Sequence, residues 1–315
     1  MKNIWNFIAD KLSENQLIYL MVNTHSHGSS PGKQGFKMAV AEDGSLHGSI
    51  GGGMMEHNLV SKARKLLAEK NTYSFLIEQD HNPKPGKEHS GMICSGKQSI
   101  LFFPLDKKHL ATIREIEVSI EENKPGVLRI SMEEFLFNKG EVLSTETQVQ
   151  EQWAYTEQLG LPDKLFIFGA GHVGLALSQL FSTLDFQVTV FDNREDLNTF
   201  EDNHFADVKK IVDFKNIEHL IPEGENIYVA VMTFAHKNDE MIVRQLASKN
   251  IQYLGMMGSE MKVKTIFDNL KNEGIPQKAL DKIDAPIGLE IGSETPAEIA
   301  VSIAAKIISV RRSLT

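Results

Sequence analysis

The sequence is poor in cysteine: Cys94 is the only one among 315 residues. A single cysteine excludes an internal disulfide, and without a Cys/His cluster a structural zinc site is not expected. The chain also has no apolar run of membrane-spanning length, and its polar first 16 residues do not fit a signal peptide. These absences predict a protein of the reducing cytoplasm that does not enter a membrane.

Basic residues are in the minority. Lys and Arg number 33 against 42 Asp and Glu, which gives a net charge of −9. No basic stretch interleaved with aromatic residues is present, so we exclude nucleic acid as a main partner. An anionic ligand must then be held locally, by helix ends and backbone N–H groups. The length and the hydrophobic content of 41% predict two globular domains.

What the sequence does contain is a nucleotide-binding pattern at residues 164–192. An apolar run ends in the glycine turn at 169–174, an amphipathic helical stretch follows, and a second apolar run ends on an acid. Gly169 permits a tight turn, Gly171 lets the backbone approach a phosphate, and Gly174 lets the helix pack on the strand. This pattern predicts a Rossmann-like domain with a parallel sheet.

The acid that ends the pattern is Asp192. A carboxylate at this place accepts hydrogen bonds from a ribose diol and repels a 2′-phosphate, which favours NAD over NADP. Arg194 follows two residues later and weakens this preference, because a guanidinium can hold a phosphate. The alternative is a Rossmann domain whose nucleotide pocket is lost or serves another ligand.

The remaining sequence predicts an α/β protein in which a smaller α+β domain precedes the Rossmann-like domain. In the smaller domain we expect helices at 2–14, 56–67 and 110–120, strands at 17–22, 36–41, 46–50, 73–77, 99–105 and 127–130, and a polar loop at 23–35. In the larger one we expect strands at 165–168, 187–191, 211–213 and 226–232, and helices at 239–248, 260–272 and 296–311. The predicted domains are 1–150 and 163–315, with a linker at 151–162.

Three further turns, at 29–33, 49–53 and 255–259, are rich in glycine or serine and could approach an anion. The second turn could instead mark a close crossing of helix and strand, and the third an ordinary strand-to-helix turn. The candidate ligand-binding residues of these turns are Ser30, Lys33, Gly51, Gly52, Gly53, Glu56, Gly258 and Ser259.

Thr233 and His236 follow the strongly apolar strand at 226–232, so they should face the same crevice as the glycine turn. His236 could act as a general acid or base, or could simply cap the next helix. No HExxH, GxSxG or P-loop motif occurs, and no nucleophile–base pair can be assembled from spacing, so we assign no catalytic residue. The candidates around the main turn are Gly169, Gly171, His172, Gly174, Asp192, Arg194, Thr233 and His236.

Cys94 lies between glycines and serine, just before an expected strand. A reachable thiolate there could contact molybdenum or receive sulfur, whereas a buried cysteine would act as a small hydrophobe. His25 and His27, two residues apart, could bind a metal or could be turn or core histidines.

Taken together, these motifs resemble the XdhC and CoxI family of xanthine dehydrogenase accessory factors. The resemblance covers nearly the whole chain and rests on residues 28–35 with Met38, 48–53 with Glu56, Cys94 with Gly96, 168–174, Asp192 with Arg194, Thr233 with Asp239, 255–259 with Lys262, and 286–300. Three positions differ from the pattern that the family often shows: Gly32 replaces an arginine, Ser95 a glycine, and Phe234 a histidine.

This resemblance implies binding of the molybdenum cofactor (molybdopterin), its protection, and its transfer to a molybdenum hydroxylase of the xanthine dehydrogenase type. It also implies a cysteine desulfurase as a second partner in some members. The leading hypothesis is therefore a cofactor chaperone without catalysis of its own. The alternatives are an NAD-dependent oxidoreductase and a non-catalytic nucleotide-binding scaffold. A homodimer is expected from the general frequency of oligomers.

Overall fold

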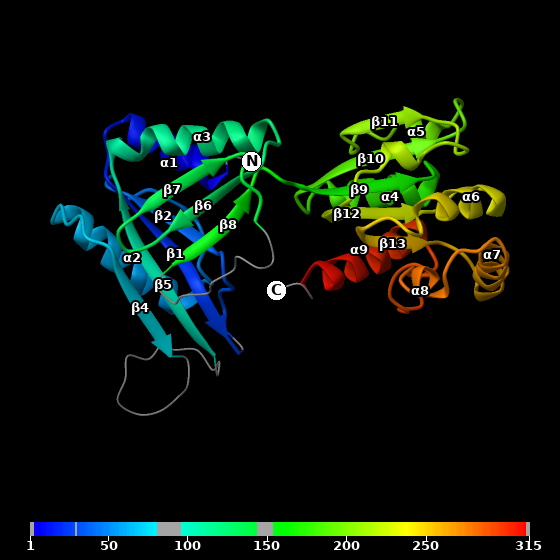
Figure 1. Cartoon of the computed structure of the whole chain (residues 1–315). Helices are drawn as coiled ribbons and strands as arrows, with labels where there is room; N and C mark the ends of the chain where they lie inside the picture. Colours follow the sequence, from blue (N-terminus) through cyan, green and yellow to red (C-terminus); the bar gives the residue numbers. More distant parts are fainter. Residues whose placement is uncertain (1–2, 29, 81–95, 144–153, 313–315) are drawn as a thin grey trace. The chain divides into compact units, whose positions relative to one another are not determined.

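The computed structural model describes residues 3–28, 30–80, 96–143 and 154–312, and its elements are drawn in Figure 1. The chain divides into two compact units, Met1–Leu161 and Pro162–Thr315. Cys94 lies outside the described residues. Within the described part, no helix has the length and apolar character needed to cross a membrane.

The first unit is built on a five-stranded antiparallel sheet. Its strands are β1 Ile18–His27, β2 Lys37–Ala41, β3 Leu46–Gly48, β4 Phe75–Asp80 and β5 Lys97–Leu105. Its helices are α1 Ile4–Ser13, α2 Gly53–Ala68, η1 Lys107–His109 and α3 Leu110–Glu121. The strand order is β3-β2-β1-β5-β4. Side chains of β1 alternate between the two faces: Leu20 and Val22 pack with α1 and α3, whereas Tyr19 and Met21 pack with α2.

A second sheet of three antiparallel strands joins the same core as α1 and α3. Its strands are β6 Gly126–Ile130, β7 Phe135–Lys139 and β8 Tyr155–Leu159, in the order β7-β6-β8. The predicted linker at 151–162 is thus wrong for residues 155–159, which pair with β6. Only Tyr155 of β8 is buried, so this edge strand lacks the apolar alternation that would have revealed it.

Strand β1 also runs five residues beyond the predicted strand at 17–22, so the loop expected from residue 23 begins later. Ser26 pairs with Gln98 and His27 with Lys97 of β5, after a bulge that follows Asn23. Backbone pairing at the end of the sheet therefore maintains the strand although its side chains are polar.

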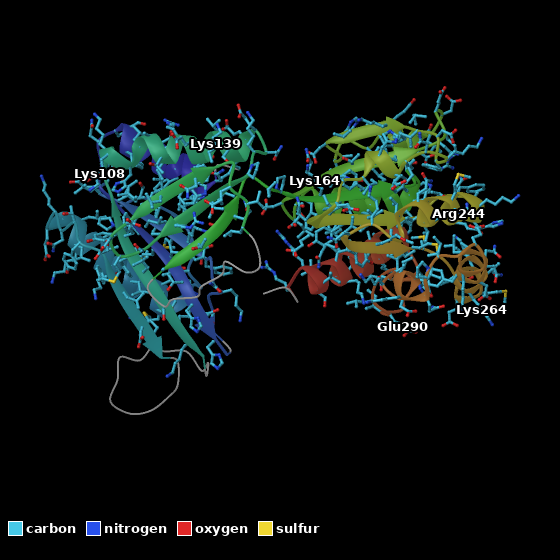
Figure 2. All side chains as sticks on the ribbon, in the orientation of Figure 1. Lys108, Lys139, Lys164, Arg244, Lys264 and Glu290 are labelled. Atoms are coloured by element: carbon cyan, nitrogen blue, oxygen red, sulfur yellow. The ribbon has the colours of Figure 1, made fainter. Side chains whose placement is uncertain are left out.

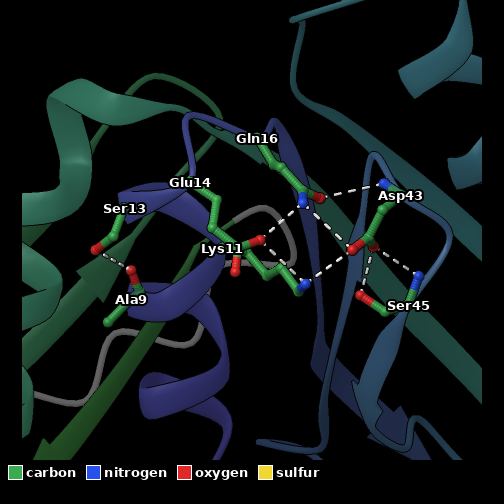
Figure 3. A network of polar contacts seen from close by, with 7 residues as sticks. All are labelled: Ala9, Lys11, Ser13, Glu14, Gln16, Asp43 and Ser45. Atoms are coloured by element: carbon green, nitrogen blue, oxygen red, sulfur yellow. Dashed lines mark hydrogen bonds and ion pairs between the residues drawn. The ribbon is translucent and has the colours of Figure 1, made fainter.

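The turn between β2 and β3 is tied to the end of α1 by a polar network (Figure 3). Lys11 Nζ lies 2.7 Å from Asp43 Oδ2, and the Ser45 hydroxyl donates to Asp43 Oδ1 at 2.5 Å. The hydrogen bonds from Lys11 and Ser45 hold the pKa of Asp43 well below its ordinary value. This network fixes the hairpin that precedes the glycine-rich turn at 49–53.

The second unit has a parallel sheet of five strands, which confirms the predicted Rossmann-like architecture. Its strands are β9 Asp163–Phe168, β10 Phe186–Asp192, β11 Val208–Ile211, β12 Gly224–Val231 and β13 Ile251–Met256. Its helices are α4 His172–Phe181, α5 Asn198–Glu201, η3 Glu218–Leu220, α6 His236–Leu246, α7 Glu260–Asn272, α8 Gln277–Leu280 and α9 Pro296–Arg312. The edge strand β11 lies three residues before its expected place at 211–213, because its half-exposed residues carry little hydrophobic signal.

Helices cover both faces of this sheet. Phe166 and Phe168 of β9 pack with α6 and α7, whereas Leu165 and Ile167 pack with α4 and α9. In the strand order β11-β10-β9-β12-β13, the chain adds β10 and β11 on one side of β9 and then β12 and β13 on the other side. A crevice is therefore expected where the carboxyl ends of β9 and β12 separate. Charged side chains such as Lys264 and Glu290 lie on the outside of the unit (Figure 2).

Candidate functional site

The three glycines of the turn after β9 have different surroundings. A Cβ on Gly169, whose φ is +117°, would lie 2.3 Å from the Met232 carbonyl oxygen, and a Cβ on Gly174 would lie 2.2 Å from the Gly169 carbonyl oxygen. Both contacts are with backbone, so packing requires these two glycines. A Cβ on Gly171 would meet no atom of the described residues within 4 Å beyond its own chain neighbours. Among the three, Gly171 therefore leaves open space into which a ligand phosphate can fit.

Hydrogen bonds fix this turn on both sides. The Gly169 amide donates to the Phe191 carbonyl oxygen at 2.8 Å, and the Thr199 hydroxyl donates to the Ala170 carbonyl oxygen at 2.5 Å. Helix α4 begins directly after the turn, with His172 exposed, and within the described residues no side chain caps its start. The first N–H groups of α4 therefore remain available to an anion in a turn that is already ordered.

Asp192 ends β10, and its buried carboxylate accepts five hydrogen bonds. Oδ1 accepts from the amides of Asn193 and Arg194 and from Arg194 Nε, and Oδ2 accepts from the Ala170 amide and Arg194 Nη2, all at 2.8–3.0 Å. Burial raises the pKa of the Asp192 carboxyl, but the hydrogen bonds from Arg194 and Ala170 outweigh it and leave the pKa below its ordinary value. Protein donors thus engage both oxygens of the group expected to hold a ribose.

Arg194 carries the charge that faces solvent beside this turn. Its side chain is 37% exposed, compared with 2% for Asp192. The guanidinium carbon lies 5.7 Å from the ring centroid of Phe234, which follows β12 and is 87% exposed. Phe234 therefore contacts Arg194, Arg194 contacts Asp192, and Asp192 contacts the glycine turn through the Ala170 amide.

A buried ion pair lies behind Thr233 at the ends of β12 and β13. Asp239 is fully buried, and its Oδ1 accepts from the Thr233 amide at 2.9 Å and the Thr233 hydroxyl at 2.6 Å. Its Oδ2 accepts from Lys262 Nζ at 2.5 Å, and Lys262 also donates to the Met257 carbonyl oxygen at 3.0 Å. Asp239 and Lys262 carried part of the family resemblance but were not among the candidate ligand-binding residues. The available signal was an acid and a lysine in the first helical turns after two adjacent strands.

The other predicted residues of this unit lie in ordinary packing positions. His236 is exposed and is the first residue of α6, but Ala235 is the N-cap and no side chain of the described residues caps this helix, so His236 does not have the capping role expected as its alternative. Ser259 is the N-cap of α7, and its hydroxyl accepts from the Lys262 amide at 3.3 Å. A Cβ on Gly258 would lie 2.9 Å from Lys262 Cδ, so this glycine makes room for the lysine stem.

In the first unit, a carboxylate occupies the turn at 49–53. Glu56 Oε2 accepts from the Ser49 hydroxyl at 2.7 Å, the Ile50 amide at 2.9 Å and the Gly52 amide at 3.0 Å. Burial raises the pKa of Glu56, but these hydrogen bonds outweigh it, so the pKa lies below its ordinary value. An ionised side chain therefore already fills the place in which we expected a phosphate, while Gly51 and Gly53 provide the turn with positive φ values.

Residues 30–33 of the serine-rich turn lie against the same segment. A Cβ on Gly32 would lie 2.1 Å from the Ile50 carbonyl oxygen, so an arginine would not fit there without movement. Ser30 is buried, and its hydroxyl donates to the Gly32 carbonyl oxygen at 3.0 Å, whereas Lys33 is exposed. Ser30 is thus enclosed by the protein, whereas Lys33 faces solvent.

An unusual polar residue of the first unit is Asn23 in β1, whose backbone exchanges hydrogen bonds with Gly35 and Phe36. Its side chain is completely buried, and neither Oδ1 nor Nδ2 has a hydrogen-bond partner among the described residues. In the described part of the chain, no group of three His, Cys, Asp or Glu residues could hold a metal ion. His25 and His27 lie in β1, and Cys94 lies outside the described ranges.

Two family models match the chain: the XdhC Rossmann domain over residues 165–307, and the XdhC and CoxI family over residues 14–76. The uncharacterized protein YqeB of Escherichia coli (strain K12) is 25% identical over 307 residues, which cover 97% of this chain and 46% of that protein. A protein of Bacillus subtilis (strain 168), described as a probable xanthine dehydrogenase subunit, is 32% identical over 152 residues, 47% of this chain and 43% of that protein.

The chain therefore spans about half the length of these two curated relatives. The crystal structure of a xanthine dehydrogenase from Bacillus halodurans matches with a TM-score of 0.73 at 24% identity. The match covers 98% of this chain and 95% of that one. At this identity the likeness establishes a shared fold over both units.

Proposed function

Because the chain belongs to the XdhC and CoxI family, we propose that it is an accessory protein in the maturation of a xanthine dehydrogenase-type enzyme. In this role it carries the molybdenum cofactor, a pterin with a phosphate and a metal-binding dithiolene, as cargo for a molybdenum hydroxylase. The relative described as a probable xanthine dehydrogenase subunit supports the choice of client.

The observation that carries the proposal is the open position at Gly171. Apart from its chain neighbours and the helix's own backbone, no atom of the described residues lies within 4 Å of a Cβ placed there, the start of α4 has no side-chain cap among them, and Arg194 is exposed nearby. Backbone N–H groups, a helix start and a guanidinium are the donors that a phosphate prefers. The residues present therefore fit the phosphate of the cargo.

The same site has acids that are poorly suited to catalysis. Asp192 is paired with Arg194, and Asp239 is paired with Lys262 and Thr233. A general base must be able to receive a proton from a substrate, but these carboxylates are already saturated by donors. This favours a carrier over the second candidate, an NAD-dependent oxidoreductase, for which the glycine fingerprint remains the supporting feature.

The test is retention of the cofactor by the full chain purified without oxygen. We expect a bound pterin, detected as its fluorescent oxidised derivative, and we expect a Gly171→Val variant to lose it. Gly171 has a φ of −73°, which valine can adopt, so the variant should keep its melting temperature. Gly174→Val, which must disturb the backbone, serves as the unfolding control.

Wild-type protein that neither contains pterin nor takes it up on incubation would contradict the proposal. Tight NADH binding with turnover of a substrate would instead support the oxidoreductase. Activation of cofactor-free hydroxylase by the loaded protein tests the client, and addition of a cysteine desulfurase tests whether sulfur is supplied to the cargo. Cys94→Ala examines a role of the thiol in retention, and sedimentation examines the proposed homodimer.

A further inference from the structure

Phe234 is an unusual residue for its position in the second unit. It directly follows Thr233 at the end of β12, and 87% of the side chain is exposed. Exposed phenyl rings gain free energy when a partner covers them. The position after β12 lies beside the reversal of strand order, where parallel sheets bind ligands. Phe234 is therefore placed to contact a ligand that enters beside the glycine turn.

The Phe234 ring contacts the guanidinium of Arg194, at 5.7 Å from the ring centroid. Arg194 uses Nε and Nη2 for its bidentate contact with Asp192. A guanidinium has five N–H groups, so three remain, and within the described residues no other hydrogen bond of its side chain is found. Asp192 therefore fixes the direction of a guanidinium that can still bind an anion.

We infer that Phe234 and Arg194 form a specificity element that stacks a flat heterocycle and binds a phosphate monoester carried by it. Phe234 contributes its apolar ring, and Arg194 contributes charge-assisted hydrogen bonds. Asp192 acts as a positioning residue because it holds the guanidinium beside the ring. The inference rests on the proposed function only for the choice of a phosphorylated pterin as first ligand.

The arrangement also predicts discrimination against NAD. The ribose diol of NAD needs a carboxylate at the end of the second strand, but both Asp192 oxygens are engaged by protein donors. A ligand with an extra phosphate monoester loses nothing from this engagement and gains the contact with Arg194. The element therefore selects ligands whose ring system carries a phosphate monoester over ligands that lack one, such as NAD.

Fluorescence titration of the full chain tests the element with a matched pair of probes. The first probe is the fluorescent oxidised pterin of the cofactor with its phosphate, and the second is the same compound after treatment with phosphatase. Wild type should bind the first about tenfold more tightly. Phe234→Ala should weaken binding of both by about tenfold, the usual size of an aromatic stacking contribution, while Phe234→Trp should retain it. Phe205→Ala, at another exposed aromatic of this unit, is the control.

Arg194→Met should remove the preference for the phosphorylated probe. It should also increase the affinity for NADH, because Asp192 would keep its three backbone donors but regain capacity for a ribose. Lys237→Met, at an exposed cation near the start of α6, should change neither ratio. NADPH is included as the other source of a ring with a phosphate monoester.

The outcomes distinguish failure of the specificity element from failure of the proposed function. If wild type binds phosphorylated pterin but the Phe234 and Arg194 variants bind it equally well, the specificity element is refuted and the proposed function stands. If wild type prefers NADPH over NADH and ignores pterin, with the same dependence on Phe234 and Arg194, the element is supported and the cofactor carrier is refuted. Binding of none of the probes would refute both.

Discussion

Asn23 provides a direct test of the reasoning about the first unit. Its carboxamide is completely buried in β1 without a partner among the described residues. A buried polar group left without a hydrogen bond costs about 1–3 kcal/mol. Leucine has the same branching at Cγ but no polar atoms, so Asn23→Leu removes this cost. We therefore expect the substitution to stabilise the first unit.

The stabilisation expected from Asn23→Leu is limited by how well the leucine side chain fits the space of the asparagine. Two methyl groups occupy more space than the amide, and overpacking in a close-packed interior costs about 1–3 kcal/mol. The removed penalty and the added apolar burial together exceed this strain, so the net stabilisation should be about 1 kcal/mol. With a urea dependence of about 2 kcal/mol per molar, the midpoint of unfolding should rise by about 0.5 M.

Tryptophan fluorescence during urea unfolding measures this change in the full chain. Both tryptophans, Trp5 and Trp153, precede residue 162, so the signal follows the first unit. Thr24→Val is the matched control at the next residue: the Thr24 hydroxyl is also buried but donates to the Ser99 carbonyl oxygen at 3.1 Å. Its loss should lower stability by about 1 kcal/mol. If both substitutions destabilise equally, Asn23 has a partner in solution, such as a buried water, and the reasoning is refuted.

Three further predictions concern the second unit. Gly174→Ala should lower its thermal stability because the new Cβ would meet the backbone at 2.2 Å, whereas Gly171→Ala should leave the melting temperature unchanged. Lys262→Met should cost about 3 kcal/mol because it leaves the buried carboxylate of Asp239 unpaired, and adding Asp239→Asn should recover part of this loss in urea unfolding followed by circular dichroism. The fold lowers the pKa of the Asp192 carboxyl, so the pair of Asp192 with Arg194 stabilises the protein fully at pH values above the ordinary aspartate pKa. This stabilisation is lost as the pH falls through the lower pKa of the folded state. Asp192→Asn should therefore flatten the acid dependence of hydrogen exchange in this unit, and an unchanged profile would contradict the assignment.

The parts of the fold that the sequence predicted best are those with continuous burial. Strands β9 and β12 are apolar runs because helices cover both faces of the parallel sheet. Helix α9 lies where a helix was predicted at 296–311, and Thr295 and Glu298 exchange hydrogen bonds at its start as in a capping box. These signals are local, so neighbouring residues are sufficient to read them.

The parts that the sequence missed depend on contacts between distant segments. Strand β8 is an edge strand with one buried residue, and only its pairing with β6 reveals it. The Asp239–Lys262 pair joins residues 23 positions apart, which lie together because β12 and β13 are neighbours. Glu56 was expected near a phosphate, but its own carboxylate takes the amides of that turn. Spacing alone does not show whether a charged residue serves a ligand or the protein.

Asp192 shows this competition most clearly. An acid at the end of the second strand indicates NAD only if the acid is free, and here an arginine two residues later folds back onto it with two hydrogen bonds of 2.9 Å. A charge-assisted hydrogen bond contributes about 1.5–3 kcal/mol, more than a bond between neutral partners. A ribose diol that displaced Arg194 would replace two hydrogen bonds between opposite charges with two from neutral hydroxyls to the same carboxylate, and would lose the attraction of the guanidinium for Asp192. A phosphate can instead bind the same guanidinium from its outer side while Asp192 still holds it. The spacing of acid and arginine therefore favours a ligand with an additional phosphate, which is why the choice between NADH and phosphorylated rings should reverse in Arg194→Met.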